Sequence, residues 1–275
     1  MTHRIIRIGR TFYGLAMIVY GVQQFVYGDF RNVLFPPWQH ILPWLPVWAY
    51  IFGAYLLASG FSIIFSKNPK NVLLVLGGTL LSLVCLFQVP YELISEPNSS
   101  YHLGLWVSTL KELALAGGAF VMAGTLPADH EASPGSSFVI NLLHKIIPYG
   151  SIFFSITIVS FGVSHFLYAE FVAALVPAWA PDHLFWTYFA AVALIGSGIC
   201  IILDIRMRAV ALLLGVMIFL WFLSLHSPAT FRDPFIDRGN NLSSSLDALA
   251  FSGTAFAIAF GLKKQKWIDD IEHLV

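Results

Sequence analysis

Two acidic residues stand inside long apolar segments of the chain. Glu112 follows Lys111 in the segment 105–124, and Asp247 lies in the segment 243–262. A run of about 20 apolar residues is long enough to cross a bilayer. An ionisable side chain at membrane depth is costly unless it faces a polar interior or a partner, so such residues are candidates for function. Glu112 and Asp247 are therefore the first candidate site residues.

The composition indicates a membrane protein built from helices. Of the 275 residues, 57% are hydrophobic and only 11% are charged, whereas soluble domains carry about 25% charged residues. The apolar runs are long and continuous, which is typical of transmembrane helices and not of membrane barrels, whose strands alternate. The net charge is zero and no basic stripe is present, so nucleic acid is not an expected partner. We expect an all-α, polytopic protein whose surroundings are the lipid bilayer.

The apolar runs predict eight transmembrane helices. The predicted spans are 11–27, 47–65, 71–89, 105–124, 148–168, 184–203, 209–226 and 243–262. If the N-terminus is cytoplasmic, most of the 15 lysine and arginine residues fall in cytoplasmic segments. Positive charge is enriched on the cytoplasmic side of membrane proteins, so both termini are predicted to be cytoplasmic.

The chain contains an internal repeat. The sequence LKELALAGGAF, which contains Glu112 and Gly118, resembles LDALAFSGTAF, which contains Asp247 and Gly253. Further matched pairs occur in the same order along both halves. The repeat therefore predicts two tandem, parallel four-helix bundles, related by a pseudo-two-fold axis along the membrane normal.

The repeat also sets the expected domain boundaries. The first four-helix unit covers residues 1–125, and the second covers residues 148–275 with a short cytoplasmic tail. Residues 126–147, which are polar and contain proline and glycine, are expected to form a cytoplasmic linker.

Three pairs of polar residues occupy matched positions in the two units. They are Gln24, Gln88 and Glu112 in the first unit, and His165, His226 and Asp247 in the second. A helix rises about 1.5 Å per residue, which places all six in the outer third of the membrane. We expect one polar ring in each bundle, serving ligand binding or proton relay. The alternative is that these side chains only hold helices together through hydrogen bonds.

Lys111 is a further candidate because it adjoins Glu112. Neighbouring residues of a helix point about 100° apart and do not pair with each other. With Glu112 facing the bundle, Lys111 is expected to extend toward the outer headgroups.

The second unit suggests more specific chemistry. Two histidines and one carboxylate, His165, His226 and Asp247, are the ligand types of a non-haem iron site, so this set is the alternative metal site. The same groups can instead accept protons beside a quinol that is being oxidised. Gln24 and Gln88 in the first unit have no protonatable group and cannot do the same.

Several motifs resemble those of the DoxX-like membrane proteins. They are GVSHF at 162–166, a proline- and tryptophan-rich outer loop, and LKELALAGGA at 110–119. The resemblance implies one four-helix domain per unit and a bacterial inner-membrane protein. Some members of the family are subunits of a thiosulfate:quinone oxidoreductase, and others belong to membrane oxidoreductase complexes. The chain departs from the family in being duplicated and in having Gln24 where the second unit has His165.

These observations lead to one expected function and one alternative. The first is a subunit of a membrane redox system that handles a quinone or a similar lipophilic carrier. The sequence shows no nucleotide-binding loop and no haem-attachment motif, so an activity of this kind is expected to need a partner redox subunit. The alternative is a small-solute transporter or a membrane scaffold without catalytic activity.

Overall fold

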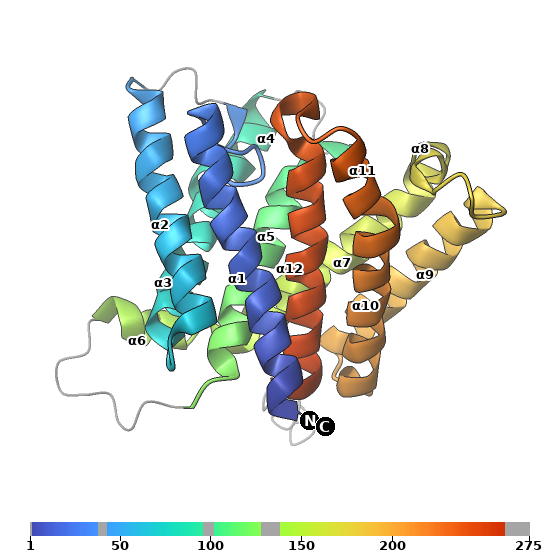
Figure 1. The fold of residues 1–275 in the computed structure, drawn as a ribbon. Coiled ribbons are helices and arrows are strands. Elements are labelled where there is room, and N and C mark those ends of the chain that lie inside the picture. The colour runs from blue at the N-terminus through green and yellow to red at the C-terminus, as the bar shows by residue number, and fades with distance from the viewer. Residues whose placement is uncertain (1, 38–42, 96–101, 128–137, 262–275) are drawn as a thin grey trace.

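The computed structural model describes residues 2–37, 43–95, 102–127 and 138–261 of the chain. Helices make up most of these residues, and no strand occurs among them. Eight helical segments are long and apolar enough to cross a membrane (Figure 1). The prediction of an all-α, multi-span membrane protein is therefore confirmed. Residues 128–137 of the predicted linker, and the predicted tail from 262 onward, lie outside the described residues.

The helices of the two halves follow the predicted spans closely. The first half contains α1 (Thr2–Tyr27), α2 (Leu45–Phe65), α3 (Lys70–Leu83), η2 (Val84–Gln88), α4 (Val89–Ser95), η4 (Leu103–Trp106) and α5 (Val107–Gly124). The second half contains α6 (Phe138–His144), η5 (Ile147–Tyr149), α7 (Gly150–Leu167), α8 (Ala169–Leu175), α9 (His183–Ile202), α10 (Met207–Trp221), η6 (Phe222–His226), α11 (Ser227–Arg232), η7 (Ile236–Arg238) and α12 (Asn240–Gly261). Only α1 departs much from its prediction, since it begins at Thr2 instead of residue 11.

The spanning helices of the two halves are packed into one body. Helix α1 packs along α2 and α12, while α7 packs along α9 and α5. The first helix of each half thus lies against the last helix of the other half, and α5 and α12 meet between them (Figure 1). This reciprocal packing fits a pseudo-two-fold relation, but it does not confirm two separate bundles.

Paired glycines allow the close contacts between the halves. A Cβ atom added at Gly9 of α1 would lie 2.5 Å from the carbonyl oxygen of Gly253 in α12. A Cβ atom added at Gly117 of α5 would lie 2.5 Å from the carbonyl oxygen of Gly150 in α7. Small residues of this kind let helix backbones approach each other in a membrane. By packing, Gly117 is therefore the counterpart of Gly253, and the predicted match of Gly118 with Gly253 is one residue out of register.

Both halves contain a π-helical turn at the same place. The turn η2 ends at Gln88 and the turn η6 ends at His226. Pro90 and Pro228 follow two residues after these ends. Proline has no N–H to donate to a carbonyl of the preceding turn, which disturbs the regular helical ladder. Turns η2 and η6 contact α5 and α12 respectively, so Gln88 and His226 approach the helices that carry the buried charges.

Candidate functional site

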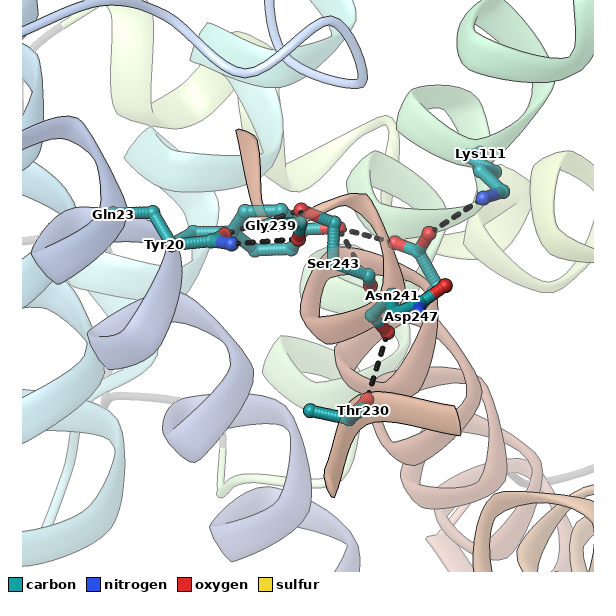
Figure 2. A network of polar contacts seen from close by, with 8 residues as sticks. All are labelled: Tyr20, Gln23, Lys111, Thr230, Gly239, Asn241, Ser243 and Asp247. Carbon is teal, nitrogen blue, oxygen red and sulfur yellow. Dashed lines mark hydrogen bonds and ion pairs between the residues drawn. The ribbon is translucent and has the colours of Figure 1, made fainter. Parts of the chain in front are cut away.

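A buried network centres on Asp247 of α12. Its Oδ1 accepts a 2.5 Å hydrogen bond from the hydroxyl of Tyr20 in α1. Its Oδ2 lies 2.9 Å from the Nζ of Lys111 in α5, an ion pair whose geometry is not that of an aligned hydrogen bond. Tyr20 is fully buried and Asp247 nearly so. Asp247 therefore connects its own helix, α12, both to α1 and to α5 (Figure 2).

The position of Lys111 corrects the sequence-based prediction. The side chain does not extend toward headgroups, because it is only 17% exposed and pairs with Asp247. Lys111 lies six residues before Gly117, as Asp247 lies six residues before Gly253. Since α5 and α12 contact each other, residues at this common level can meet. Lys111, and not Glu112, thus takes the position that corresponds to Asp247.

The network continues toward the end of the molecule where α1 finishes and α12 begins, called here the distal end. The Tyr20 hydroxyl lies 3.3 Å from the carbonyl oxygen of Ser243. The Ser243 hydroxyl donates to the amide oxygen of Gln23 at 3.2 Å, and the Gln23 amide donates to the carbonyl of Gly239 at 3.1 Å. Figure 2 shows these contacts between α1 and the start of α12. They fix the relative position of the two helices at Tyr20 and on its distal side.

Glu112 forms a second site, separate from this network. Its side chain is fully buried, and neither carboxylate oxygen has a hydrogen-bond partner among the described residues. Gln88 and Cys85, both in η2, lie next to the carboxylate. The Nε2 of Gln88 instead donates at 2.9 Å to the carbonyl oxygen of Asn32. The structure therefore brings two predicted site residues together, Glu112 and Gln88, without a well-aligned hydrogen bond to the carboxylate from any described residue.

Gln24 is the third predicted residue of the first unit. Its side chain is fully buried, and neither amide atom finds a hydrogen-bond partner within the described part of the chain. Gln24 packs against Gly53 of α2. The alternative interpretation, that Gln24 only holds helices together by hydrogen bonds, is thus not supported by any bond it makes here.

The two predicted histidines occupy different surroundings. His226 lies near Lys111, and so approaches the Asp247 network. The Nδ1 of His165 lies 2.7 Å from the carbonyl oxygen of Phe161 in its own helix, and its ring stacks on Trp221. Within the described ranges, no three His, Cys, Asp or Glu residues are grouped so that they could hold a metal ion. The structure therefore gives no support to the alternative metal site.

Tyr20 is a central residue that the sequence analysis missed. It precedes Gln24 by four residues, so the two lie on one face of α1, and this spacing was a usable signal. Phe161 stands at the corresponding position of the second half, because Tyr20 follows Gly9 by eleven residues and Phe161 follows Gly150 by eleven residues. The hydroxyl of the first half has no equivalent in the second, so the network is asymmetric.

Comparison of the chain with protein-family models, with curated proteins and with solved structures finds no match. The resemblance to the DoxX-like proteins consequently rests on the short motifs alone.

Proposed function

We propose that the protein belongs to a membrane redox system and binds a quinone or a similar lipophilic carrier beside Glu112 and Gln88. The observation that carries this proposal is the fully buried carboxylate of Glu112, which has no hydrogen-bond partner among the described residues. Leaving a polar group buried and unpaired is costly, and a ligand with its own polar atoms would remove that cost. The position is next to a π-helical turn, a feature that is frequent at functional sites.

The chemistry of the site suits a carrier that exchanges protons. A quinone carbonyl accepts a hydrogen bond, and its reduction to the quinol takes up two electrons and two protons. A protonated Glu112 would donate to the carbonyl and then supply one proton, as a general acid does, and water would supply the second proton. The Gln88 amide, which lies next to the carboxylate, would orient the ring. The electrons would come from a partner redox subunit.

The Lys111–Asp247 pair favours the alternative, small-solute transport. The pair lies between α5 and α12, where the two halves meet. Buried ionisable residues in membrane proteins often mark the path of a substrate or a proton. In this alternative the pair would open when the halves move, and Glu112 would bind the solute or a proton. A scaffold without activity would need neither group.

We also propose a family membership for the chain and a location in the membrane. Membership of the DoxX-like family, and with it a bacterial inner membrane, is supported by the motifs of the sequence. A duplication of a four-helix unit is supported by the matched π-helical turns η2 and η6 and by the reciprocal glycine contacts. Cytoplasmic placement of both termini is supported by the distribution of lysine and arginine.

Solvent extraction of the protein purified in mild detergent tests the proposed carrier. We expect chromatography of the extract to give a quinone in about stoichiometric amount for the unchanged protein. The variant Glu112→Ala should lose most of it, because it removes the hydrogen-bond donor to the quinone carbonyl. Glu170→Ala is the matched control, since Glu170 is exposed on α8, and it should retain the carrier. An empty unchanged protein, or equal quinone in the Glu112→Ala variant, would contradict the proposal.

A further inference from the structure

A short segment between α1 and α2 covers the distal end of the first half. It consists of residues 28–36, called here the lid, and these residues form no regular helix. Its apolar side chains are turned inward, since Leu34 is fully buried and Val33 and Phe35 are only 6% exposed. The ring centre of Phe35 lies 4.9 Å from that of Phe87 in η2. The lid is therefore inserted against the π-helical turn of the first half.

The lid is attached to the turn that lines the proposed carrier site. The Nε2 of Gln88 donates at 2.9 Å to the carbonyl oxygen of Asn32 in the lid, and Gln88 also lies next to the carboxylate of Glu112. Glu112 is fully buried, so a ligand can reach the carboxylate only if part of the protein moves. The lid is the candidate for this movement, because the chain contains an equivalent segment in a second arrangement.

The second half contains the counterpart of the lid. The sequence GVQQFVY at 21–27 aligns with GVSHFLY at 162–168, and the same register continues through the lid and through residues 169–177. Three positions of the two segments carry identical residues: Phe30 and Phe171, Leu34 and Leu175, and Pro36 and Pro177. The two segments are thus equivalent parts of the repeat.

The equivalent segments have opposite arrangements. In the second half, Ala169–Leu175 forms the helix α8, which packs beside α9 at the edge of the molecule (Figure 1). Leu175 is 52% exposed and Phe171 is 69% exposed, whereas Leu34 is fully buried. The same residue types therefore face inward in one half and outward in the other. Segments that can adopt two arrangements are the ones that open and close over binding sites.

Gly28 gives a physical reason for the difference between the halves. Its φ is +60°, and its N–H donates at 2.9 Å to the carbonyl oxygen of Gln24, which ends α1. The matched residue is Ala169, which instead begins the helix α8. A residue with a Cβ atom is disfavoured in the left-handed region. Glycine at position 28 therefore favours the inserted arrangement of the lid.

We propose that the lid closes the Glu112 site and opens by moving outward, to an arrangement like that of α8. Opening would break the hydrogen bond between Gln88 and Asn32 and free the Gln88 amide for a ligand. It would also withdraw the Phe35 ring from Phe87. As a gate for a lipophilic carrier, the lid rests on the function proposed above. The structure then represents the closed state of the first half.

Labelling of a single cysteine tests the lid without any quinone. Cys85 and Cys200 are replaced by serine in the full chain, and Leu34→Cys is the reporter, treated with N-ethylmaleimide in mild detergent. We expect it to react far more slowly than in the same protein unfolded in SDS. Gly28→Ala should raise the rate about tenfold, because the closed lid would then hold an alanine in the left-handed region. Gln88→Leu, which removes the bond to the lid, should also raise it several-fold.

The controls separate opening of the lid from general loosening. Gly196→Ala is the matched control for Gly28→Ala, because a Cβ atom there would meet nothing within 4 Å, and it should leave the rate unchanged. A second reporter, Ile201→Cys, replaces a fully buried residue of the second half and should not respond to any of the variants. If Leu34→Cys does not fold, Val33→Cys takes its place, since Val33 is also buried in the lid.

Three results would overturn the proposal. The first is labelling of Leu34→Cys as fast as in the unfolded protein, since the lid would then not be closed. The second is an equal rate with and without Gly28→Ala and Gln88→Leu, since the segment would then be a fixed plug. The third is an equal rise at Ile201→Cys, which is general loosening. A bound quinone without a response of the lid leaves the proposed function standing, and a response of the lid in a quinone-free protein leaves the lid standing alone.

Discussion

The Nζ of Lys111 lies 2.9 Å from the Oδ2 of Asp247, and this contact joins the last helix of the first half to the last helix of the second. Each residue stands six positions before the glycine through which its own helix meets the opposite half. The two partners are therefore counterparts in the repeat, one basic and one acidic. Such a pair can form only where the halves face each other, so it ties the halves together directly.

Removal of either partner of this pair should be strongly destabilising. Lys111→Ala or Asp247→Ala leaves one buried charge without its partner, and we expect each to lower the free energy of unfolding by about 3 kcal/mol. The double variant Lys111→Met with Asp247→Leu should cost much less than the two losses added together. Unfolding of the purified protein by denaturant, arranged as a double-mutant cycle, measures the coupling. Additive losses would show that the two charges do not depend on each other.

Tyr20→Phe should destabilise the protein through the loss of one hydrogen bond. A bond to a charged acceptor contributes about 1.5–3 kcal/mol, and a bond between neutral groups about 1 kcal/mol. The matched control is Tyr13→Phe, since the Tyr13 hydroxyl donates at 2.6 Å to the neutral carbonyl of Leu115. We expect Tyr20→Phe to be the more costly change in thermal unfolding. The effect of Tyr20→Phe should largely disappear when Asp247 is replaced by alanine. If the effect persisted in that background, the hydrogen bond from Tyr20 to Asp247 would not be its cause.

The transmembrane architecture could be predicted from the sequence because it depends on composition. A span needs about 20 apolar residues in any order, and α2, α9 and α12 lie within a few residues of their predicted bounds. The start of α1 could not be found in this way. Its first residues carry Arg4 and Arg7, so the helix runs beyond the apolar segment.

Which helices pack against each other was harder to predict from the sequence, because it depends on which helix faces approach each other. The repeat led to bundles formed within each half, and α1 does pack on α2 and α7 on α9, but α1 also packs on α12 and α7 on α5. A one-residue change of register, from Gly118 to Gly117, moves Lys111 into the place expected for Glu112. That change turns a predicted headgroup contact into a buried ion pair. Aligned letter for letter, LKELALAGGAF and LDALAFSGTAF place Lys111 on Asp247 and Gly117 on Gly253, so this register was readable from the sequence.

Glu112→Gln should have little effect on stability, in contrast to Asp247→Asn. The Glu112 carboxylate makes no hydrogen bond among the described residues, so a neutral side chain of the same shape loses no native contact. We expect its free energy of unfolding to stay within about 0.5 kcal/mol of the unchanged protein or to rise. Asp247→Asn removes the charge that pairs with Lys111 and should cost about 2 kcal/mol or more. Chemical denaturation of ligand-free protein compares them, and a large loss for Glu112→Gln would reveal a structural partner.

Gly253→Ala should destabilise the contact between the halves. A Cβ atom at Gly253 would lie 2.5 Å from the carbonyl oxygen of Gly9, and backbone cannot move aside as a flexible side chain can. Overpacking of this kind typically costs about 1–3 kcal/mol. Gly196→Ala is the matched control, because a Cβ atom there would meet nothing within 4 Å. Thermal unfolding should show a clear loss for Gly253→Ala and almost none for Gly196→Ala. Equal behaviour of the two variants would mean that α1 and α12 do not approach each other as closely as the glycine contact requires.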